Sequence, residues 1–331
     1  MAQFWICDRA KAICITTHPS RENDLPRRQM LVRNIEKHEI DVFVRSYGHP
    51  GYENWIKRLF RTGETRPEWC FVVEEDGSHI GSAIYFQYEG NESEMNLVGL
   101  VLPWEGDYLE AGERLLQEST KELQASGIHK LESRCDTRHK HHREMISLFE
   151  QLGFELIQDK HRYVLADLNR EYEHGNRLVF RTLGQVGEGE FTTAIERVTV
   201  DTLDRVDSKD VEILGSETSA REYFNILKSI DHNPDHWLLA YDESDELVGL
   251  VVAQNLSEAA GCINYIGVIP EHRGNGYSRD LLIEASELLR GVGSVEEIIA
   301  DIDTENRPLE AALASLGYTR SKSMWVYHKY C

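Results

Sequence analysis

An internal repeat constrains this sequence more than any other feature. The segment that begins at Trp69 aligns without a gap with the segment that begins at Trp237, and Gly81 then falls opposite Gly249. Each segment reads as a strand, an acidic turn and a second strand, which is the pattern of a β-hairpin. Self-similarity of this kind indicates that one structural unit occurs twice.

Further landmarks repeat in the same order along the chain. The matching segments are 98–103 with 265–270, 115–116 with 281–282, 135–137 with 302–304, and 148–154 with 312–318. We therefore expect two α/β units, each with a mixed and mainly antiparallel sheet flanked by helices. The expected domains are 1–168 and 177–331, because the stretch 167–177 is polar and has little apolar periodicity.

The charge balance restricts the partners. Lysine and arginine together number 36 and the acids 57, so the net charge is −21. A general nucleic-acid-binding protein needs a basic face to neutralise phosphates, so we expect no nucleic-acid partner. The acidity is compatible with a cationic small-molecule acceptor such as an amine, and equally with a role in solubility alone.

Cysteine usage indicates a reducing compartment. The six cysteines form no CxxC pair, and no His/Cys cluster has zinc spacing, so we predict no metal site. Residues 1–14 carry charges at Asp8, Arg9 and Lys11, unlike a signal peptide. No run of about 18 apolar residues occurs, so we expect a cytoplasmic protein without a membrane partner.

A glycine-rich loop between a strand and a helix is the strongest candidate site. The strand is stopped by Pro270, and a helix with apolar residues at helical spacing begins at Tyr277. Gly274 and Gly276 permit positive φ, and the main-chain N–H groups at such a helix start bind phosphate. Arg273 adds a charge at the mouth of the loop. The alternative is a simple tight turn.

The motif resembles the acyl-CoA loop of the GNAT superfamily of N-acetyltransferases. The segment Arg273–Ser278 follows the pattern R-x-x-G-x-[G/A] with Ser278 in the last position, and Val268-Ile-Pro precedes it as in that superfamily. Asn306, followed eleven residues later by Gly317 and an aromatic, is similar too. The resemblance covers residues 178–330 well and 1–165 more weakly. Tandem copies with one degenerate half occur in this superfamily, as in mycothiol synthases.

The resemblance implies acetyl-CoA as the cofactor and a set of residues that hold it. The main chain near Ile266 and Val268 would bind the pantetheine arm, and Asn306 would contact pantetheine or cap the next helix. The pyrophosphate would be held by the N–H groups of Arg273, Gly274, Asn275, Gly276, Tyr277 and Ser278.

Three positions at which the family has catalytic residues depart from the family pattern. Leu313 stands where the usual tyrosine acid would be, and the usual positions of a carboxylate base hold Asn264 and Cys262. Asn264 could orient a water or the amine, which makes it one catalytic candidate. Tyr265 is the other, although strand alternation places it on the opposite face unless a bulge intervenes, and a core role suits it as well. Glu258, in the preceding loop, could also reach the site.

The first copy departs further. Asp107 replaces the arginine of the loop and Glu110 replaces its second glycine. Two carboxylates would repel a pyrophosphate, so we expect that this copy does not bind CoA in the usual way.

These features favour an acetyl-CoA-dependent N-acetyltransferase that acts on the primary amine of a small molecule by direct attack on the thioester. A non-catalytic acyl-CoA-binding sensor or regulator is the second hypothesis, since both the acid and the base are missing. An interaction protein that has lost the cofactor is the third. A monomer and a homodimer are both compatible with the sequence.

Overall fold

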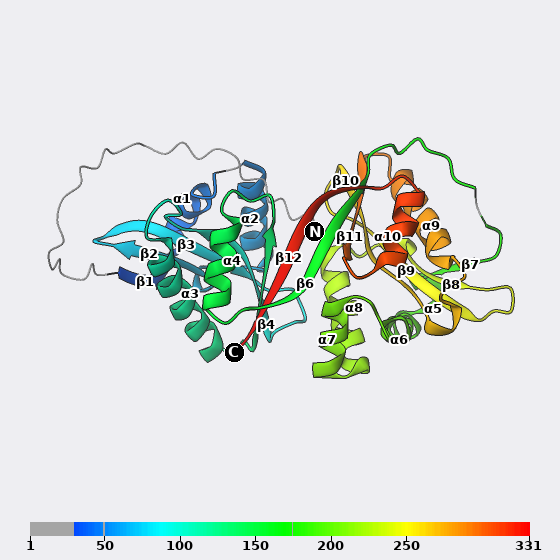
Figure 1. Ribbon diagram of the computed structural model, residues 1–331, viewed down its shortest axis with the longest axis horizontal. Coiled ribbons are helices and arrows are strands. Elements are labelled where there is room, and N and C mark those ends of the chain that lie inside the picture. The colour runs from blue at the N-terminus through cyan, green and yellow to red at the C-terminus, as the bar shows by residue number, and fades with distance from the viewer. Residues whose placement is uncertain (1–29, 49, 174) are drawn as a thin grey trace. The chain divides into compact units, whose positions relative to one another are not determined.

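The computed structural model describes residues 30–48, 50–173 and 175–331. The sequence predictions for residues 1–14, and the first part of the predicted domain 1–168, lie outside these residues. Figure 1 shows the elements along the chain.

The first half contains, in order, β1 (Met30–Asn34), η1 (Lys37–Glu39), α1 (Ile40–Arg45), α2 (Pro50–Thr62), η2 (Pro67–Trp69), β2 (Cys70–Glu75), β3 (Ser78–Phe86), β4 (Glu94–Val101), α3 (Tyr108–Ala125), β5 (Lys130–Asp136), α4 (His142–Gln151) and β6 (Glu155–Leu165). The second half contains β7 (Val179–Thr182), α5 (Leu183–Val186), α6 (Glu188–Thr199), α7 (Arg205–Leu214), α8 (Ser216–Ile230), η3 (Pro234–His236), β8 (Trp237–Tyr241), β9 (Leu247–Asn255), β10 (Ala260–Val268), η4 (Pro270–His272), α9 (Tyr277–Gly291), β11 (Glu297–Asp303), α10 (Arg307–Ser315) and β12 (Thr319–Tyr330).

The order of elements confirms two copies of one mixed α/β fold. Both predicted hairpins are present, as β2–β3 and β8–β9, and the strand after each hairpin is followed by a long helix. The pairs β2–β3, β3–β4, β8–β9 and β9–β10 are antiparallel, and β4–β5 and β10–β11 are parallel. Among the described residues, none of the helices is both long and apolar enough to cross a membrane.

The chain forms two compact units that do not follow the sequence order strictly. The C-terminal unit contains Leu156–Val326 with Glu89–Asn91, and the N-terminal unit contains residues 30–88, Glu92–Glu155 and Tyr327–Cys331. Nearly all of β6 therefore belongs to the C-terminal unit, where it pairs antiparallel with β11 from Lys160↔Asp303 to Leu165↔Ile298. The division of the chain into repeat copies at 1–168 and 177–331 rests on sequence similarity, and it stays a prediction.

The sheet of the C-terminal unit has the strand order β12-β6-β11-β10-β9-β8-β7. One apolar core joins this sheet to α9 and α10, and includes Ile263, Leu281 and Leu313. A second core joins the other face to α6 and α8, and includes Phe191, Phe224 and Tyr265. In Figure 1, α9 and α10 accordingly lie on one side of these strands and α6, α7 and α8 on the other.

The N-terminal unit repeats this plan with its own strands. Its strand order is β1-β2-β3-β4-β5, followed by the last residues of β12. Tyr327 is buried against Phe149 at a ring-centroid distance of 5.6 Å, and the main-chain N–H of Cys331 donates to the carbonyl of His129 at 2.8 Å. The last five residues therefore complete this unit.

Candidate functional site

The parallel strands β10 and β11 separate midway along their length. Their paired residues run only from Ala260↔Glu297 to Cys262↔Ile299, although β10 continues to Val268 and β11 to Asp303. On its other edge, β10 stays paired with β9 as far as Val268↔Gly249. The edge of β10 from Ile263 onward therefore faces a gap, where an extended ligand can bond to the main chain. Ile266 and Val268 lie on this stretch.

The glycine loop adjoins the end of this gap. Gly274 and Gly276 have φ of 82° and 77°, and Gly276 is the residue before α9. The N–H of Arg273 already donates to the carbonyl of Pro270 at 3.2 Å. The next five N–H groups, from Gly274 to Ser278, find no acceptor within the part of the chain that the structure describes. Such donors at the positive end of a helix dipole form an anion-binding surface.

The side chain of Arg273 points away from this surface. Its guanidinium donates to the carbonyls of Val268 (3.0 Å), Asp201 (3.0 Å), Val198 (3.0 Å) and Val200 (2.6 Å). Three of these carbonyls lie at the C-terminal end of α6 and just beyond it, where the helix dipole favours a cation. The side chain thus connects the glycine loop to the end of α6, which is a positioning role.

A second arginine, which the motif did not identify, lies on the loop instead. Arg177 comes from the polar linker and donates to the Asn275 carbonyl at 2.9 Å and to the Asp280 carboxylate at 2.7 Å. Its guanidinium also stands 4.5 Å from the ring centre of Tyr277. Arg177 therefore supplies the positive charge beside the free N–H groups that the sequence analysis attributed to Arg273.

The β10 strand contains a bulge at the two predicted catalytic candidates. The register with β9 shifts between Ile263 and Tyr265, and Asn264 has no partner residue in that ladder. Ile263 and Ile266 face α9 and α10, whereas Tyr265 packs in the opposite core. Without the bulge, alternation would place Ile263 and Tyr265 on the same face.

The bulge brings both side chains to the face of α8. The Asn264 amide donates to the Gln254 side-chain oxygen at 2.6 Å, and Gln254 donates in turn to the Leu227 carbonyl on α8. The Tyr265 ring lies 4.7 Å from that of Tyr223, also on α8. Tyr265 is 9 % exposed, and burial raises the pKa of its hydroxyl well above the usual range, so the hydroxyl stays protonated.

A family comparison identifies the fold that holds this loop. Residues 203–318 match the acetyltransferase (GNAT) family. This part of the chain is a GNAT domain. No curated protein matches the chain in sequence.

Solved structures resemble the whole chain. A GCN5-related N-acetyltransferase from Sphaerobacter thermophilus is 17 % identical, covers 93 % of this chain and 97 % of its own, and superposes with a TM-score of 0.64. A tandem GNAT protein from the clavulanic acid biosynthesis pathway is 12 % identical, with coverages of 91 % and 98 % and a TM-score of 0.57. These likenesses show that the tandem fold extends over both copies of the repeat.

In a third solved structure, only part of a larger protein resembles this chain. The glucosamine N-acetyltransferase region of a fungal multi-domain GH3 β-N-acetylglucosaminidase is 14 % identical, with a TM-score of 0.58. The match covers 94 % of this chain and 39 % of that protein.

The remaining predicted residues of the GNAT domain have local roles as well. The Asn306 side chain accepts from the N–H of Leu309 at 3.2 Å, which is the helix cap that the sequence analysis named as its alternative role. Leu313 is fully buried in the α9–α10 core. Burial also raises the pKa of the Cys262 thiol to about 11. Glu258 is exposed in the turn before β10, at the end remote from the glycine loop.

The N-terminal unit lacks the features of this loop. Asp107 and Glu110 lie at the start of α3 and are exposed, and none of the residues between Leu102 and Tyr108 has a positive φ. The strands β4 and β5 also separate, after Leu97↔Ser133. There, however, the Tyr52 hydroxyl from α2 donates to the Val98 carbonyl, at the first residue of β4 past the paired region. An internal side chain thus takes a carbonyl that an extended ligand would need.

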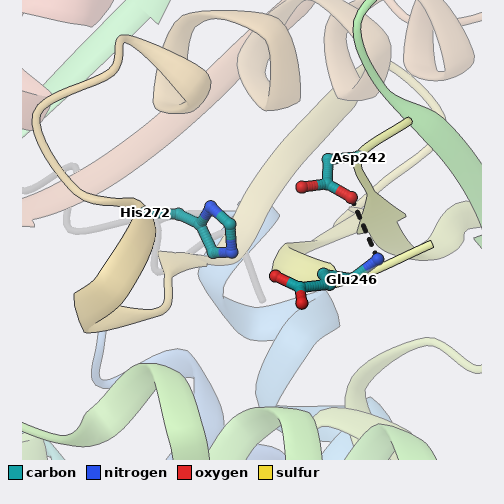
Figure 2. A group of neighbouring side chains, drawn as sticks. All are labelled: Asp242, Glu246 and His272. Carbon is teal, nitrogen blue, oxygen red and sulfur yellow. Dashed lines mark hydrogen bonds between the residues drawn. The ribbon is translucent and has the colours of Figure 1, made fainter. Parts of the chain in front are cut away.

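A group of possible metal ligands lies near the glycine loop. Asp242, Glu246 and His272 present ligand atoms within 4.8 Å of one another, although their sequence spacing matches no metal motif (Figure 2). Asp242 accepts from the N–H groups of Ser244 and Glu246 at 2.9 and 3.0 Å. These two bonds explain the position of Asp242 within its hairpin turn, so we assign the group no part in the reaction.

Proposed function

We propose that the chain is an acetyl-CoA-dependent N-acetyltransferase that acts on the primary amine of a small molecule. One observation carries the proposal: the gap between β10 and β11 leads to five successive free N–H groups at the start of α9. The membership of residues 203–318 in the GNAT family supports acyl-CoA-dependent transfer in general.

The cofactor would extend along the gap. The main chain at Ile266 and Val268 would bond to the pantetheine arm, and the N–H groups from Gly274 to Ser278 would hold the pyrophosphate beside Arg177. Asn306 would approach the pantetheine from the start of α10. The thioester would lie beside β10, where a main-chain N–H polarises its carbonyl and an amine attacks directly.

Calorimetric titration with acetyl-CoA tests the cofactor site. We expect one site in the wild type and none in Gly276→Glu, because a carboxylate beside the pyrophosphate repels it. Asn275→Asp places the same charge at a residue without positive φ, so it separates charge repulsion from backbone strain. Gly189→Glu is the control, since nothing lies within 4 Å of a Cβ there.

Two results would contradict this site. One is a wild type that binds no acetyl-CoA, and the other is binding that neither loop variant weakens while both stay folded by circular dichroism. Two binding sites in the wild type would contradict the expectation for the N-terminal unit.

A non-catalytic acyl-CoA-binding protein is the second candidate. The buried Leu313 at the position of the usual acid favours it, because leucine donates no proton. Release of CoA thiol in the presence of primary amines separates the two: cofactor binding without any release across a broad amine panel supports the regulator.

A further inference from the structure

The first turn of α7 connects the two strands that separate at the candidate site. Arg205, the first residue of α7, donates from Nε to the buried carboxylate of Asp303 at 2.9 Å, and Asp303 is the last residue of β11. Two residues later, the Asp207 carboxyl interacts with the Tyr265 hydroxyl on β10. The turn therefore lies against both strands on the face opposite α9, and Asp207 contacts β10 at Tyr265, within the stretch that faces the gap.

The surroundings of Asp207 disfavour its negative charge. The side chain is half-buried, and burial raises the pKa of its carboxyl well above the usual range. Asp204, which caps α7, and Asp210 on α7 raise this pKa further, whereas Lys160 on β6 and the Tyr265 hydroxyl lower it. A cation that binds at Asp207 would be attracted by its carboxylate and also by those of Asp204 and Asp210.

The hydrogen bonds around Asp207 accommodate both of its protonation states. The Thr199 hydroxyl lies 2.6 Å from the Ile195 carbonyl and 3.0 Å from the Tyr265 hydroxyl. If Thr199 donates to Ile195, Tyr265 donates to Thr199, and the Tyr265 oxygen can then only accept a hydrogen bond from protonated Asp207. If Asp207 is ionised, both hydroxyls rotate and Tyr265 donates to the carboxylate instead.

We propose that Asp207 binds the acceptor and is the base that deprotonates it, and that the acceptor is a cationic primary amine without a neighbouring carboxylate. This rests on the proposed N-acetyltransferase function. Asp207 would take the role of the carboxylate base, whose usual positions on β10 hold Cys262 and Asn264. Asp207 lies on α7, outside the motif that resembles the GNAT superfamily. Tyr265 is the positioning residue, because its hydroxyl interacts with the Asp207 carboxyl.

The proposed acyl transfer needs only the two substrates and the Asp207 carboxylate to account for every proton and bond. The ammonium of the acceptor gives one proton to ionised Asp207, and the neutral amine attacks the carbonyl carbon of the thioester. The new C–N bond forms, the C–S bond breaks, and the remaining excess proton on nitrogen passes to the departing sulfur. Protonated Asp207 then returns its proton to water. A poised base of this kind accelerates reactions by about 10²–10⁴-fold.

Carboxyl ¹³C NMR of the full chain, saturated with acetyl-CoA, tests the assignment. The Asp207 signal is identified by its loss in Asp207→Asn. We expect it to titrate above the ordinary aspartate range near pH 3.9, and the midpoint to fall when 1,4-diaminobutane is added, because the bound ammonium stabilises the carboxylate. β-Alanine, whose own carboxylate opposes binding, should shift the midpoint less.

An ordinary midpoint for Asp207, or a midpoint that 1,4-diaminobutane leaves unchanged, would overturn the inference. Glu212→Gln removes an exposed acid of the same helix and should retain the full response. A wild type that binds no acetyl-CoA instead refutes the proposed function, so the two failures are distinguishable.

Kinetics provide an independent readout. With a primary amine that supports thiol release, Asp207→Asn should lower kcat at least about 100-fold while the Kd for acetyl-CoA stays unchanged. The rising limb of kcat/KM with pH should disappear in Asp207→Asn and move in Tyr265→Phe. Equal kcat and equal pH profiles in wild type and Asp207→Asn would exclude the base role.

Discussion

Among single residues, Asp207, the proposed base, shows how an ionisable group can lower the stability of the fold that holds it. Its pKa is raised in the folded chain, so the folded state binds its proton more tightly than the unfolded state does. The stability of the fold therefore falls as pH rises through the interval between the unfolded and the folded pKa. Above that interval, the ionised carboxyl is a lasting cost to stability.

Asp207→Asn should accordingly stabilise the protein at pH 8 and have little effect at pH 3. We expect the melting temperature at pH 8 to rise by a few degrees, the shift that about 1 kcal/mol produces in domains of this size. Thermal unfolding of both proteins at the two pH values checks this. A lower melting temperature for Asp207→Asn at pH 8 would show that the carboxylate stabilises the fold.

Residue roles were predictable where they depend on neighbours in the sequence. The positive φ of the loop glycines and the cap at Asn306 follow from local pattern, whereas the catalytic roles of Asn264 and Tyr265 stay predictions. Arg177 and the proposed base Asp207 could not be found in this way, because both lie far in sequence from the residues that they contact. The regular spacing of Asp204, Asp207 and Asp210 on one helix was the one available signal.

Among the elements, β10 determines the geometry of the site because β9 and α6 fix its position and a bulge changes its register. β9 fixes one edge, the bulge redirects two side chains, and α6 presses on the strand at Gly267. A Cβ at Gly267 would lie 2.6 Å from the Cβ of Val198 on α6. A contact this close requires α6 or the strand to move.

Gly267→Ala should therefore lower the free energy of unfolding by about 1–3 kcal/mol, the usual cost of overpacking. The control is Gly189→Ala in α6, where nothing lies within 4 Å of the new Cβ and alanine improves helix propensity. Urea unfolding of both variants checks the opposite signs. If Gly267→Ala proves as stable as the wild type, α6 does not constrain the strand.

The elements themselves were largely predictable. Hairpin alternation gave β2–β3 and β8–β9, and helical spacing gave the start of α9 at Tyr277. The bulge in β10 was foreseen only as a condition for Tyr265 to share a face with Asn264, because a register shift depends on the partner strand as well as on the sequence of β10.

For the whole molecule, the repeat predicted two copies but not the membership of their last strands. β6 ends the first copy (1–168) and pairs within the C-terminal unit, whereas Tyr327–Cys331 end the second copy (177–331) and belong to the N-terminal unit. The alternation of a strand specifies which of its faces is buried but not which strand it pairs with, so the sequence alone did not determine these memberships.

Deletion of residues 327–331 should selectively destabilise the N-terminal unit. It removes the buried rings of Tyr327 and His328, and the hydrogen bond from His328 to Glu132 on β5. Hydrogen exchange should show lost protection in β5 and α4, with β9 and β10 retained. Cys331→Ser, which keeps the main chain intact, is the control. Equal protection of β5 in the deletion variant and the full chain would contradict this role.

The membership of these strands also sets an order of events during synthesis. A ribosome releases β1 to α4 long before it reaches Tyr327, so the earliest part of the chain must wait, incomplete, for residues made near the end. Meanwhile β6 emerges next to the first copy and has to remain unpaired until β11 is translated. A chaperone that shields apolar strands during that interval would therefore raise the yield of the folded protein.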